Sequence, residues 1–247
     1  MDEPYNCQCP YPDCGIVSEY RAPQPSDTGP VVAQDCPACG KKFSPRSVSA
    51  VQKLLSAQIR HKLHRPMLDS QHPLDLEALA RQNQEPDPDP LKEPLVVVLD
   101  NIRSLHNVGA IFRTADAAGF SRLYLCGMTG VPPRNEIAKV SLGAETWMPF
   151  GYQIFLPAAV MPLKKKGYQI VALEKCDGST GLYESLKAEK LQLPLALIVG
   201  NEVGGLSHEG VAMADQICHL NMRGRKESLN VSVAFGVASY FLAEYLL

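Results

Sequence analysis

The chain lacks the features that mark membrane-spanning, secreted or strongly basic proteins. No apolar run approaches the roughly 20 residues of a bilayer span. The first ten residues, MDEPYNCQCP, lack the basic and then apolar layout of a secretory signal peptide. The formal net charge of -2 excludes a chain that coats nucleic acid over its whole surface. We therefore expect a cytoplasmic protein without a membrane partner.

The net charge is small, but the charged residues are unevenly distributed along the chain. From Lys41 to Arg65 there are seven Lys or Arg and no Asp or Glu. From Pro66 to Pro94 there are seven acidic residues and only two basic ones. The basic run has two interpretations, an arm that contacts phosphates and an ordinary solvated helix face. The acidic run ends in EPDPDPLKEP, in which four prolines in ten residues predict a stiff, non-helical linker.

Five of the eight cysteines lie in the first 39 residues, and their spacing predicts a metal site. Cys9 and Cys14 belong to CPYPDCG, and Cys36 and Cys39 belong to CPACG. Each Cys-Gly pair suits a tight turn around a thiolate, and four thiolates can close a tetrahedral structural zinc site. Cys7 is an alternative to Cys9, although the CPYPDCG pattern favours Cys9.

These patterns divide the chain into three parts. We expect a zinc-ribbon-like module over 1–45, a basic helix and Pro-rich acidic linker over 46–94, and the main domain over 95–247. Beyond residue 95, short apolar runs alternate with helical stretches, which is typical of an α/β domain with a mostly parallel sheet covered on both faces. The expected strands are 95–100, 122–126, 168–174, 195–200 and 217–222, and the expected helices are about 108–118, 134–141, 157–165, 182–188, 207–212 and 230–246.

Three loops of this domain carry the residue types that bind ligands. In a parallel sheet the loops that leave the carboxyl ends of the strands gather at one edge, where ligands bind. The glycines of IVGNEVGGLS (198–207) allow backbone amides to approach a ligand, although they do not have the G-x-G-x-x-G spacing of dinucleotide-binding loops. Taken singly, each loop also fits an ordinary turn with helix caps. The other two loops are LDNIRSLHNVGAIFRTADAAGF (99–120) and NMRGRKESLNVSVAFG (221–236).

Together the three loops resemble the three motifs of the SpoU branch of the SPOUT RNA methyltransferases, the TrmH-like ribose 2'-O-methyltransferases. The matching patterns are N-x5-R-T-A, G-N-E-x-G-G-L-S and M-R-G-x-x-x-S-L-N-V-S-V-A, in this order. KVSLGAE (139–145) matches a further segment of the family, and the resemblance covers about residues 95 to 247. The residues before 95 depart from the usual family layouts, and a zinc ribbon with a basic helix would dock RNA by a different device.

The resemblance implies a fold, a donor and a set of site residues. It implies a C-terminal trefoil knot, S-adenosylmethionine as methyl donor, tRNA or rRNA as substrate, and a homodimer with its active site at the subunit interface. Arg113 would either accept the proton of the ribose hydroxyl or stabilise the developing alkoxide. An alternative is a catalytically inactive RNA-binding or ribosome-assembly factor, which the intact motifs disfavour. The implied catalytic residues are Asn107, Arg113, Glu202, Ser228 and Asn230, and the implied donor-binding residues are Gly200, Leu220, Met222 and Leu229.

Overall fold

The protein is described from a computed structural model of its 247 residues. The structure describes residues 5–8, 17–20, 34–36, 39–43 and 88–247. The expected basic helix and two of the expected zinc ligands, Cys9 and Cys14, lie outside these ranges. Among the helices in these ranges, none has both the length and the hydropathy needed to cross a bilayer.

A seven-stranded sheet forms the centre of the main domain, and every neighbouring pair in it is parallel. The central strands are buried along their whole length because helices cover both faces, which explains their continuous apolar sequences. The expected mostly parallel sheet is therefore confirmed. In spatial order the strands are β7 (Phe150–Gln153), β6 (Arg122–Cys126), β5 (Leu95–Asp100), β10 (Leu195–Val199), β8 (Gln169–Leu173), β11 (Gln216–His219) and β9 (Thr180–Gly181).

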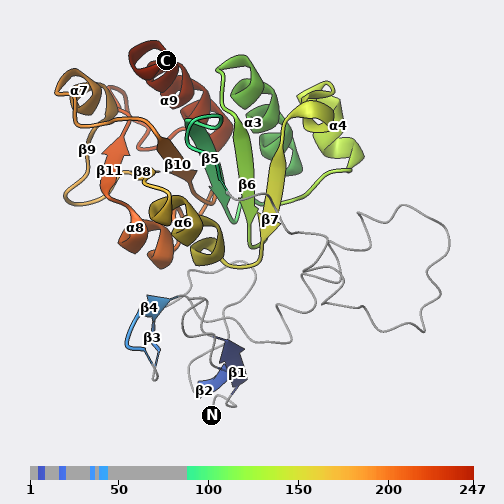
Figure 1. The fold of residues 1–247 in the computed structure, drawn as a ribbon, viewed down its shortest axis with the longest axis vertical. Helices are drawn as coiled ribbons and strands as arrows, with labels where there is room; N and C mark the ends of the chain where they lie inside the picture. The colour runs from blue at the N-terminus through green and yellow to red at the C-terminus, as the bar shows by residue number, and fades with distance from the viewer. Residues whose placement is uncertain (1–4, 9–16, 21–33, 37–38, 44–87) are drawn as a thin grey trace.

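Alternate side chains of the strands enter two separate hydrophobic clusters, one on each face of the sheet. On β5, Leu95 and Val97 belong to the larger cluster, whereas Val96 and Val98 belong to the smaller one. Figure 1 shows the helices on the two sides of the sheet. The larger cluster includes side chains of α3 (Leu105–Ala117), α4 (Asn135–Ser141), α5 (Ala144–Trp147), α7 (Leu182–Lys187) and α9 (Val231–Leu246), and the smaller one those of α6 (Leu156–Lys165) and α8 (His208–Met213).

The helices and strands expected beyond residue 95 are present, with differences at their ends. Helix α3 begins three residues earlier than expected because the Ser104 hydroxyl caps it by accepting from the backbone N of Asn107. Strand β11 ends at His219, so that Leu220 and Met222 lie in the loop that follows and not on the strand. The elements β7, β9 and α5 were not expected, since runs of two to four residues show little periodicity.

The C-terminal helix packs beside the helix of the first loop. Helices α3 and α9 are in contact, and the Cβ position of Gly236 on α9 would lie 3.8 Å from Thr114 Cγ2 on α3. At the end of α3, the rings of Phe120 and Phe235 meet edge to face with centroids 5.2 Å apart. This packing holds the first turns of α9 against the C-terminal end of α3, although the two helices lie far apart in sequence.

Glu93 belongs to the main domain, although it lies on the linker side of the expected boundary. Its carboxylate pairs with Arg122, with 2.6 Å between Oε1 and Nη2, and both side chains are largely buried. The hydroxyl of Tyr168 donates to the backbone oxygen of Glu93 at 2.6 Å. Burial, together with the nearby charge of Glu93, raises the pKa of Tyr168 to about 12. Tyr168 therefore stays a neutral hydrogen-bond donor at physiological pH.

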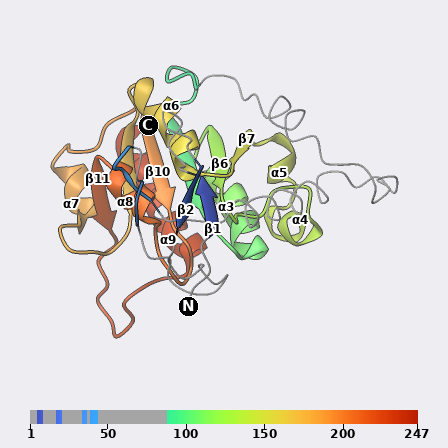
Figure 2. The ribbon, with the colours of Figure 1, turned by 90° about the horizontal axis from the view of Figure 1, so that it is seen from below.

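Two short antiparallel hairpins precede the main domain. Strand β1 (Tyr5–Gln8) pairs with β2 (Val17–Tyr20), and β3 (Gln34–Asp35) pairs with β4 (Lys42–Phe43). The β3–β4 hairpin lies against α8, as the views in Figures 1 and 2 show. Cys36 next to this hairpin is 2% exposed and joins the smaller hydrophobic cluster with Met213 of α8. The N-terminal part is thus in direct contact with the main domain.

Candidate functional site

The loop after β10 is folded tightly by its own backbone. Gly205 has a φ of +66°, and its N and O exchange hydrogen bonds with the O and N of Asn201 at 3.0 and 2.8 Å. The Asn201 carboxamide accepts from the backbone N atoms of Val203 and Gly204, each at 2.9 Å. A Cβ at Gly200 would lie 2.5 Å from the backbone of Gly205, so this position requires glycine. The glycines of the second motif therefore close a turn at the carboxyl edge of the sheet.

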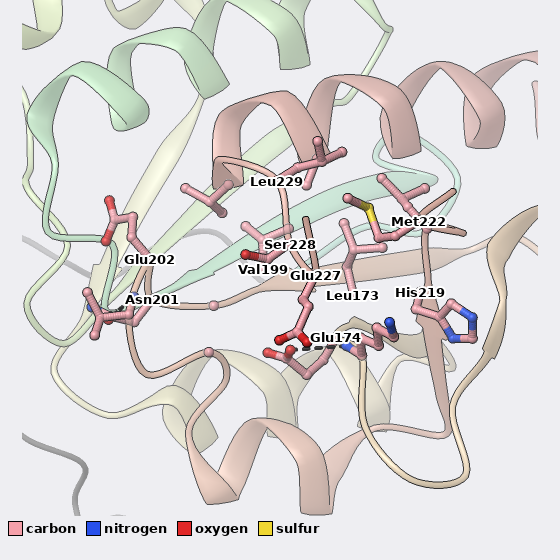
Figure 3. A pocket seen from close by; sticks show the side chains of 17 residues that line it. Leu173, Glu174, Val199, Asn201, Glu202, His219, Met222, Glu227, Ser228 and Leu229 are labelled. Atoms are coloured by element: carbon pink, nitrogen blue, oxygen red, sulfur yellow. Dashed lines mark hydrogen bonds between the residues drawn. The ribbon is translucent and has the colours of Figure 1, made fainter. Parts of the chain in front are cut away.

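A pocket opens at this edge between the loops that follow three neighbouring strands. Its 17 lining residues come from the end of β8 and the loop after it, from the 199–205 segment, and from the 219–234 segment between β11 and α9. Figure 3 shows Leu229 and Met222 on one side of the pocket and Glu174 on another. The four residues that the resemblance assigns to the donor all line it: Gly200, Leu220, Met222 and Leu229.

A polar network joins the three motifs beside this pocket. Asn107 is buried at the beginning of α3, and its Nδ2 donates to Glu202 Oε1 at 2.8 Å. Its Oδ1 accepts from Asn230 Nδ2 at 3.1 Å and from Ser232 Oγ at 3.5 Å. Asn230 also caps α9, because its Oδ1 accepts from the backbone N of Ser232 at 2.9 Å. One buried carboxamide thus fixes the second and third loops relative to the first.

The Glu202 carboxylate is turned toward N–H donors, although the residue as a whole is exposed. Besides Asn107, the backbone N atoms of Arg103 and Ser104 donate to it at 3.1 and 3.0 Å. Partial burial opposes ionisation, but the hydrogen bonds from Asn107 and from these backbone groups outweigh it and lower the pKa of Glu202. Glu202 is therefore an ionised carboxylate at the positive end of α3, and its low pKa makes it a weak proton acceptor.

Two of the five implied catalytic residues lie outside this network. Ser228 lines the pocket, but its hydroxyl makes no hydrogen bond within the described part of the chain. Arg113 is exposed on α3, opposite the side that buries Val108 and Phe112 in the core. Among the described residues its guanidinium has no ion pair or hydrogen bond. The single chain brings together Asn107, Glu202 and Asn230 and leaves Arg113 apart from them.

Sequence reasoning missed two residues that shape the site. Glu174 follows β8 and lines the pocket, and the signal was a polar residue at the end of the apolar run YQIVALE. Ser232 fitted a simple helix cap from the sequence, but its hydroxyl also reaches Asn107. Its Oγ donates to Asn230 Oδ1 at 2.7 Å as well, which adds it to the network.

Cys36 and Cys39 lie in a tight turn between β3 and β4. The backbone N of Gly40 donates to the O of Cys36 at 2.8 Å, and the N of Cys36 donates to the O of Lys41 at 3.0 Å. Gly40 has a φ of +69°, which the glycine of the Cys-Gly pair permits. Within the described ranges no three metal-ligating side chains gather, and the expected partners Cys9 and Cys14 fall outside those ranges.

A parallel sheet with a loop-built pocket at its carboxyl edge is the arrangement found in α/β domains that bind small molecules. Residues 94–240 match the SpoU rRNA Methylase family, and the chain belongs to this family. It is 35% identical over 151 residues to the tRNA (guanosine(18)-2'-O)-methyltransferase of Aquifex aeolicus, a match that covers 60% of this chain and 68% of that protein. Over 165 residues it is 32% identical to the 23S rRNA (guanosine-2'-O-)-methyltransferase RlmB of Vibrio cholerae, with 65% of each chain covered.

Solved structures of relatives have the same fold. The AdoMet-bound rRNA methyltransferase of Sinorhizobium meliloti superposes with a TM-score of 0.59 at 30% identity, over 65% of this chain and 60% of that one. The TrmH/SpoU tRNA modifying enzyme of A. aeolicus superposes with a TM-score of 0.54 at 29% identity, over 70% of this chain and 84% of that one. The similarity therefore concerns the main domain, and the matches span 65% to 68% of the two curated relatives' lengths.

Proposed function

We propose that the protein transfers a methyl group from S-adenosylmethionine to a ribose 2'-hydroxyl of tRNA or rRNA. The observation that carries this proposal is the pocket at the carboxyl edge, built from the second and third motifs and joined to the first by Asn107. The names of the relatives support it, since they are guanosine 2'-O-methyltransferases of tRNA and rRNA. The AdoMet-bound relative supports the choice of donor.

The residues of the pocket fit this donor. Gly200 brings backbone close to the ligand, and Leu220, Met222 and Leu229 offer apolar surface to an adenine ring. When bound, S-adenosylmethionine supplies an electrophilic methyl group on a sulfonium. The chain's own contribution is to hold the reacting groups in line, through loops that Asn107 fixes relative to one another.

The proton of the ribose hydroxyl and the negative charge that develops on the attacking oxygen involve different groups. The Glu202 carboxylate is engaged with three N–H donors and has a lowered pKa, so it orients Asn107 and does not accept the substrate proton. The guanidinium of Arg113 supplies positive charge to the oxygen as it attacks the methyl group, while the hydroxyl proton passes to water.

The loop that follows β11 provides a surface for RNA. Arg223, Arg225 and Lys226 are exposed beside pocket residues Met222 and Ser228. Their charges are suited to phosphate contacts, which give affinity and position with little sequence information. The basic run between 41 and 65 would add further phosphate contacts.

We propose that two copies of the chain form a homodimer across α9. The exposed apolar side chains on and next to this helix recur every three or four residues, which makes one continuous stripe. Because Arg113 does not line the pocket of its own chain, we further propose that it serves the pocket of the partner copy. The stripe consists of Leu229, Val233, Val237 and Tyr240, with exposed fractions of 42%, 52%, 40% and 50%.

Mixed dimers test this shared site. A chain with Arg113→Ala and a chain with Asn230→Ala should each be inactive alone. Dimers that combine the two regain one complete site if Arg113 acts on the partner, and regain none if it acts within its own chain. Size-exclusion chromatography with light scattering gives the oligomeric state, and a monomeric wild type that is fully active would refute the dimer.

The N-terminal 45 residues are proposed to bind one structural zinc ion through Cys9, Cys14, Cys36 and Cys39. The tight turn at Cys36 and Gly40 supports this proposal, because a Cys-x-x-Cys-Gly turn is typical of structural zinc sites. Four thiolates require a reducing compartment, in keeping with the cytoplasm. The chain from residue 46 to about Lys92 would connect this module to the catalytic domain, since Glu93 already pairs with Arg122 of that domain.

The C-terminal segment is proposed to form the trefoil knot of SPOUT proteins. The course of the chain supports this, since β11 lies near one edge of the sheet and α9 returns to α3 beside the central strands. This segment carries the third motif and lines the pocket together with the loop of the second motif. The knot would therefore restrain the same loops that bind the donor.

Transfer of a labelled methyl group tests the activity. Purified protein is incubated with labelled S-adenosylmethionine and with tRNA or rRNA from cells that lack the gene. We expect label in one of the two RNAs, and nuclease mapping should place it at a 2'-O-methylated nucleotide. RNA binding without any transfer would reject the enzyme and leave an RNA-binding factor.

A further inference from the structure

Glu174 connects three walls of the pocket. It follows β8, and its backbone N donates to the O of Cys218 on β11 at 2.8 Å. Its carboxylate accepts from the backbone N of Leu206 at 3.0 Å through Oε2 and from the N of Lys175 at 3.0 Å through Oε1. The residue thus reaches from the end of its own strand to the neighbouring strand and to the loop of the second motif.

The carboxylate lies against the most tightly built part of that loop. A Cβ on Gly205 would lie 2.5 Å from Glu174 Oε2, and a Cβ on Gly200 would lie 2.5 Å from the backbone of Gly205 and Leu206. Glu174, the Gly205–Leu206 backbone and Gly200 therefore form three layers in van der Waals contact. Asn201 holds the loop from within, whereas Glu174 holds it from outside.

We propose that Glu174 is a positioning residue that anchors the 201–207 loop in the shape that binds the methyl donor. The identity of the donor rests on the proposed function. A carboxylate suits this role because both of its oxygens are acceptors, and the two N–H groups it contacts both need one. A glutamine offers one oxygen and one NH₂ group, so it can satisfy only one of the two.

Calorimetry with two ligands separates positioning from a direct charge effect on the donor. S-adenosylmethionine carries one more positive charge than its product, S-adenosylhomocysteine. If Glu174 acts through the loop, Glu174→Ala weakens both ligands by the same factor, roughly tenfold for a lost anchoring hydrogen bond, and Glu174→Gln by less. If its charge acts on the sulfonium, only the donor loses affinity, which would overturn the proposal.

Glu136→Gln is the matched control. Glu136 is exposed on α4 and does not line the pocket, so this variant removes a carboxylate without touching the donor site. We expect Glu136→Gln to leave the affinity for S-adenosylhomocysteine unchanged. In steady-state kinetics, Glu174→Ala should raise the KM for the donor while kcat at saturating donor and the KM for RNA stay unchanged. Equal donor KM values for Glu174→Ala and wild type would also overturn the proposal.

Hydrogen exchange separates this proposal from the proposed function. In the protein without ligand, the amide of Leu206 should exchange faster in Glu174→Ala than in wild type, while amides of the central strand β10 keep their protection. If Leu206 exchanges faster in Glu174→Ala but the protein binds no S-adenosylmethionine, the proposed donor is wrong and the anchoring role of Glu174 is retained. Unchanged exchange at Leu206 would reject the anchor whatever the ligand.

Discussion

Asn107 Nδ2 lies 2.8 Å from Glu202 Oε1, and the two residues are 95 positions apart in the chain. The hydrogen bond joins the first turn of α3 to the loop after β10. Because Asn107 is buried and also accepts from Asn230, it can take only one orientation that satisfies both neighbours. The first, second and third motifs thus depend on one carboxamide, and their relative positions change together if it is altered.

Glu202→Gln should lower both stability and activity. The carboxylate accepts from Asn107 and from the backbone of Arg103 and Ser104, and a glutamine would turn an NH₂ group toward one of these donors. We expect a loss of about 1–2 kcal/mol in the free energy of unfolding, because the group is partly exposed. Urea unfolding measures it. Glu136→Gln on α4 removes the same charge from an exposed position and should leave both properties unchanged.

The stability difference between wild type and Glu202→Gln should depend on pH. The pKa of Glu202 is lowered from its ordinary value of 4.5, because its hydrogen bonds favour the charged form over the opposing effect of burial. Its contribution is therefore complete above pH 4.5 and is lost as the pH falls through the lower, folded-state pKa. Urea midpoints of the two proteins should differ at pH 7 and converge in acid. A gap that stays constant down to the acid transition would contradict the assignment.

Much of the site could be predicted because its residues belong to sequence motifs at the ends of apolar strands. The strand at 95–100 was predicted with its observed ends, since a continuous apolar run bounded by polar residues is unambiguous. The partners of Asn107 could not be predicted, because a hydrogen bond across 95 residues leaves no local signal. Glu174 was missed for the same reason, since its acceptor role depends on the distant backbone of Leu206.

Arg113→Ala and Asn230→Ala should both abolish methyl transfer but differ in stability. Arg113 is exposed and has no partner in the described part of the chain, so its removal should leave the melting temperature unchanged. Asn230 caps α9 and bonds to Asn107, so its loss should cost about 1–2 kcal/mol. Thermal unfolding and single-turnover transfer measure the two effects. Near wild-type turnover of Arg113→Ala on its RNA would show that the assigned site is wrong.

Glu93→Ala should be strongly destabilising, although Glu93 follows a proline-rich linker. It pairs with Arg122, whose side chain is only 10% exposed, and removal of the carboxylate leaves a largely buried positive charge. We expect a loss of about 3 kcal/mol, read from chemical unfolding. The adjacent Lys92→Ala is the control, since Lys92 is 83% exposed and pairs only at the surface with Asp89. Equal unfolding midpoints for the two variants would show that Glu93 belongs to the linker and does not stabilise the main domain.

Removal of the proposed zinc ion should weaken the main domain as well as the N-terminal module. The three-part division of the sequence predicts that the N-terminal module is independent of the donor site. However, Cys36 is 2% exposed and shares a hydrophobic cluster with Met213 of α8, and Leu206 of the donor loop packs against the same cluster. Loss of the hairpin would expose this cluster to water and loosen the helix that follows the loop.

We therefore expect that a chelator releases about one zinc ion per chain, lowers the melting temperature and weakens the binding of S-adenosylmethionine. Donor affinity by calorimetry, before and after chelation and after zinc is restored, measures the coupling. The test variant is Met213→Ala, which removes the contact on α8 and keeps all four cysteines. The control variant is Met161→Ala, which lies in the same cluster but on α6. Met213→Ala should lower donor affinity at full zinc occupancy, because the hairpin then supports α8 less well. Unchanged donor affinity after complete zinc release would show that the N-terminal module is independent of the donor site, as the sequence alone suggested.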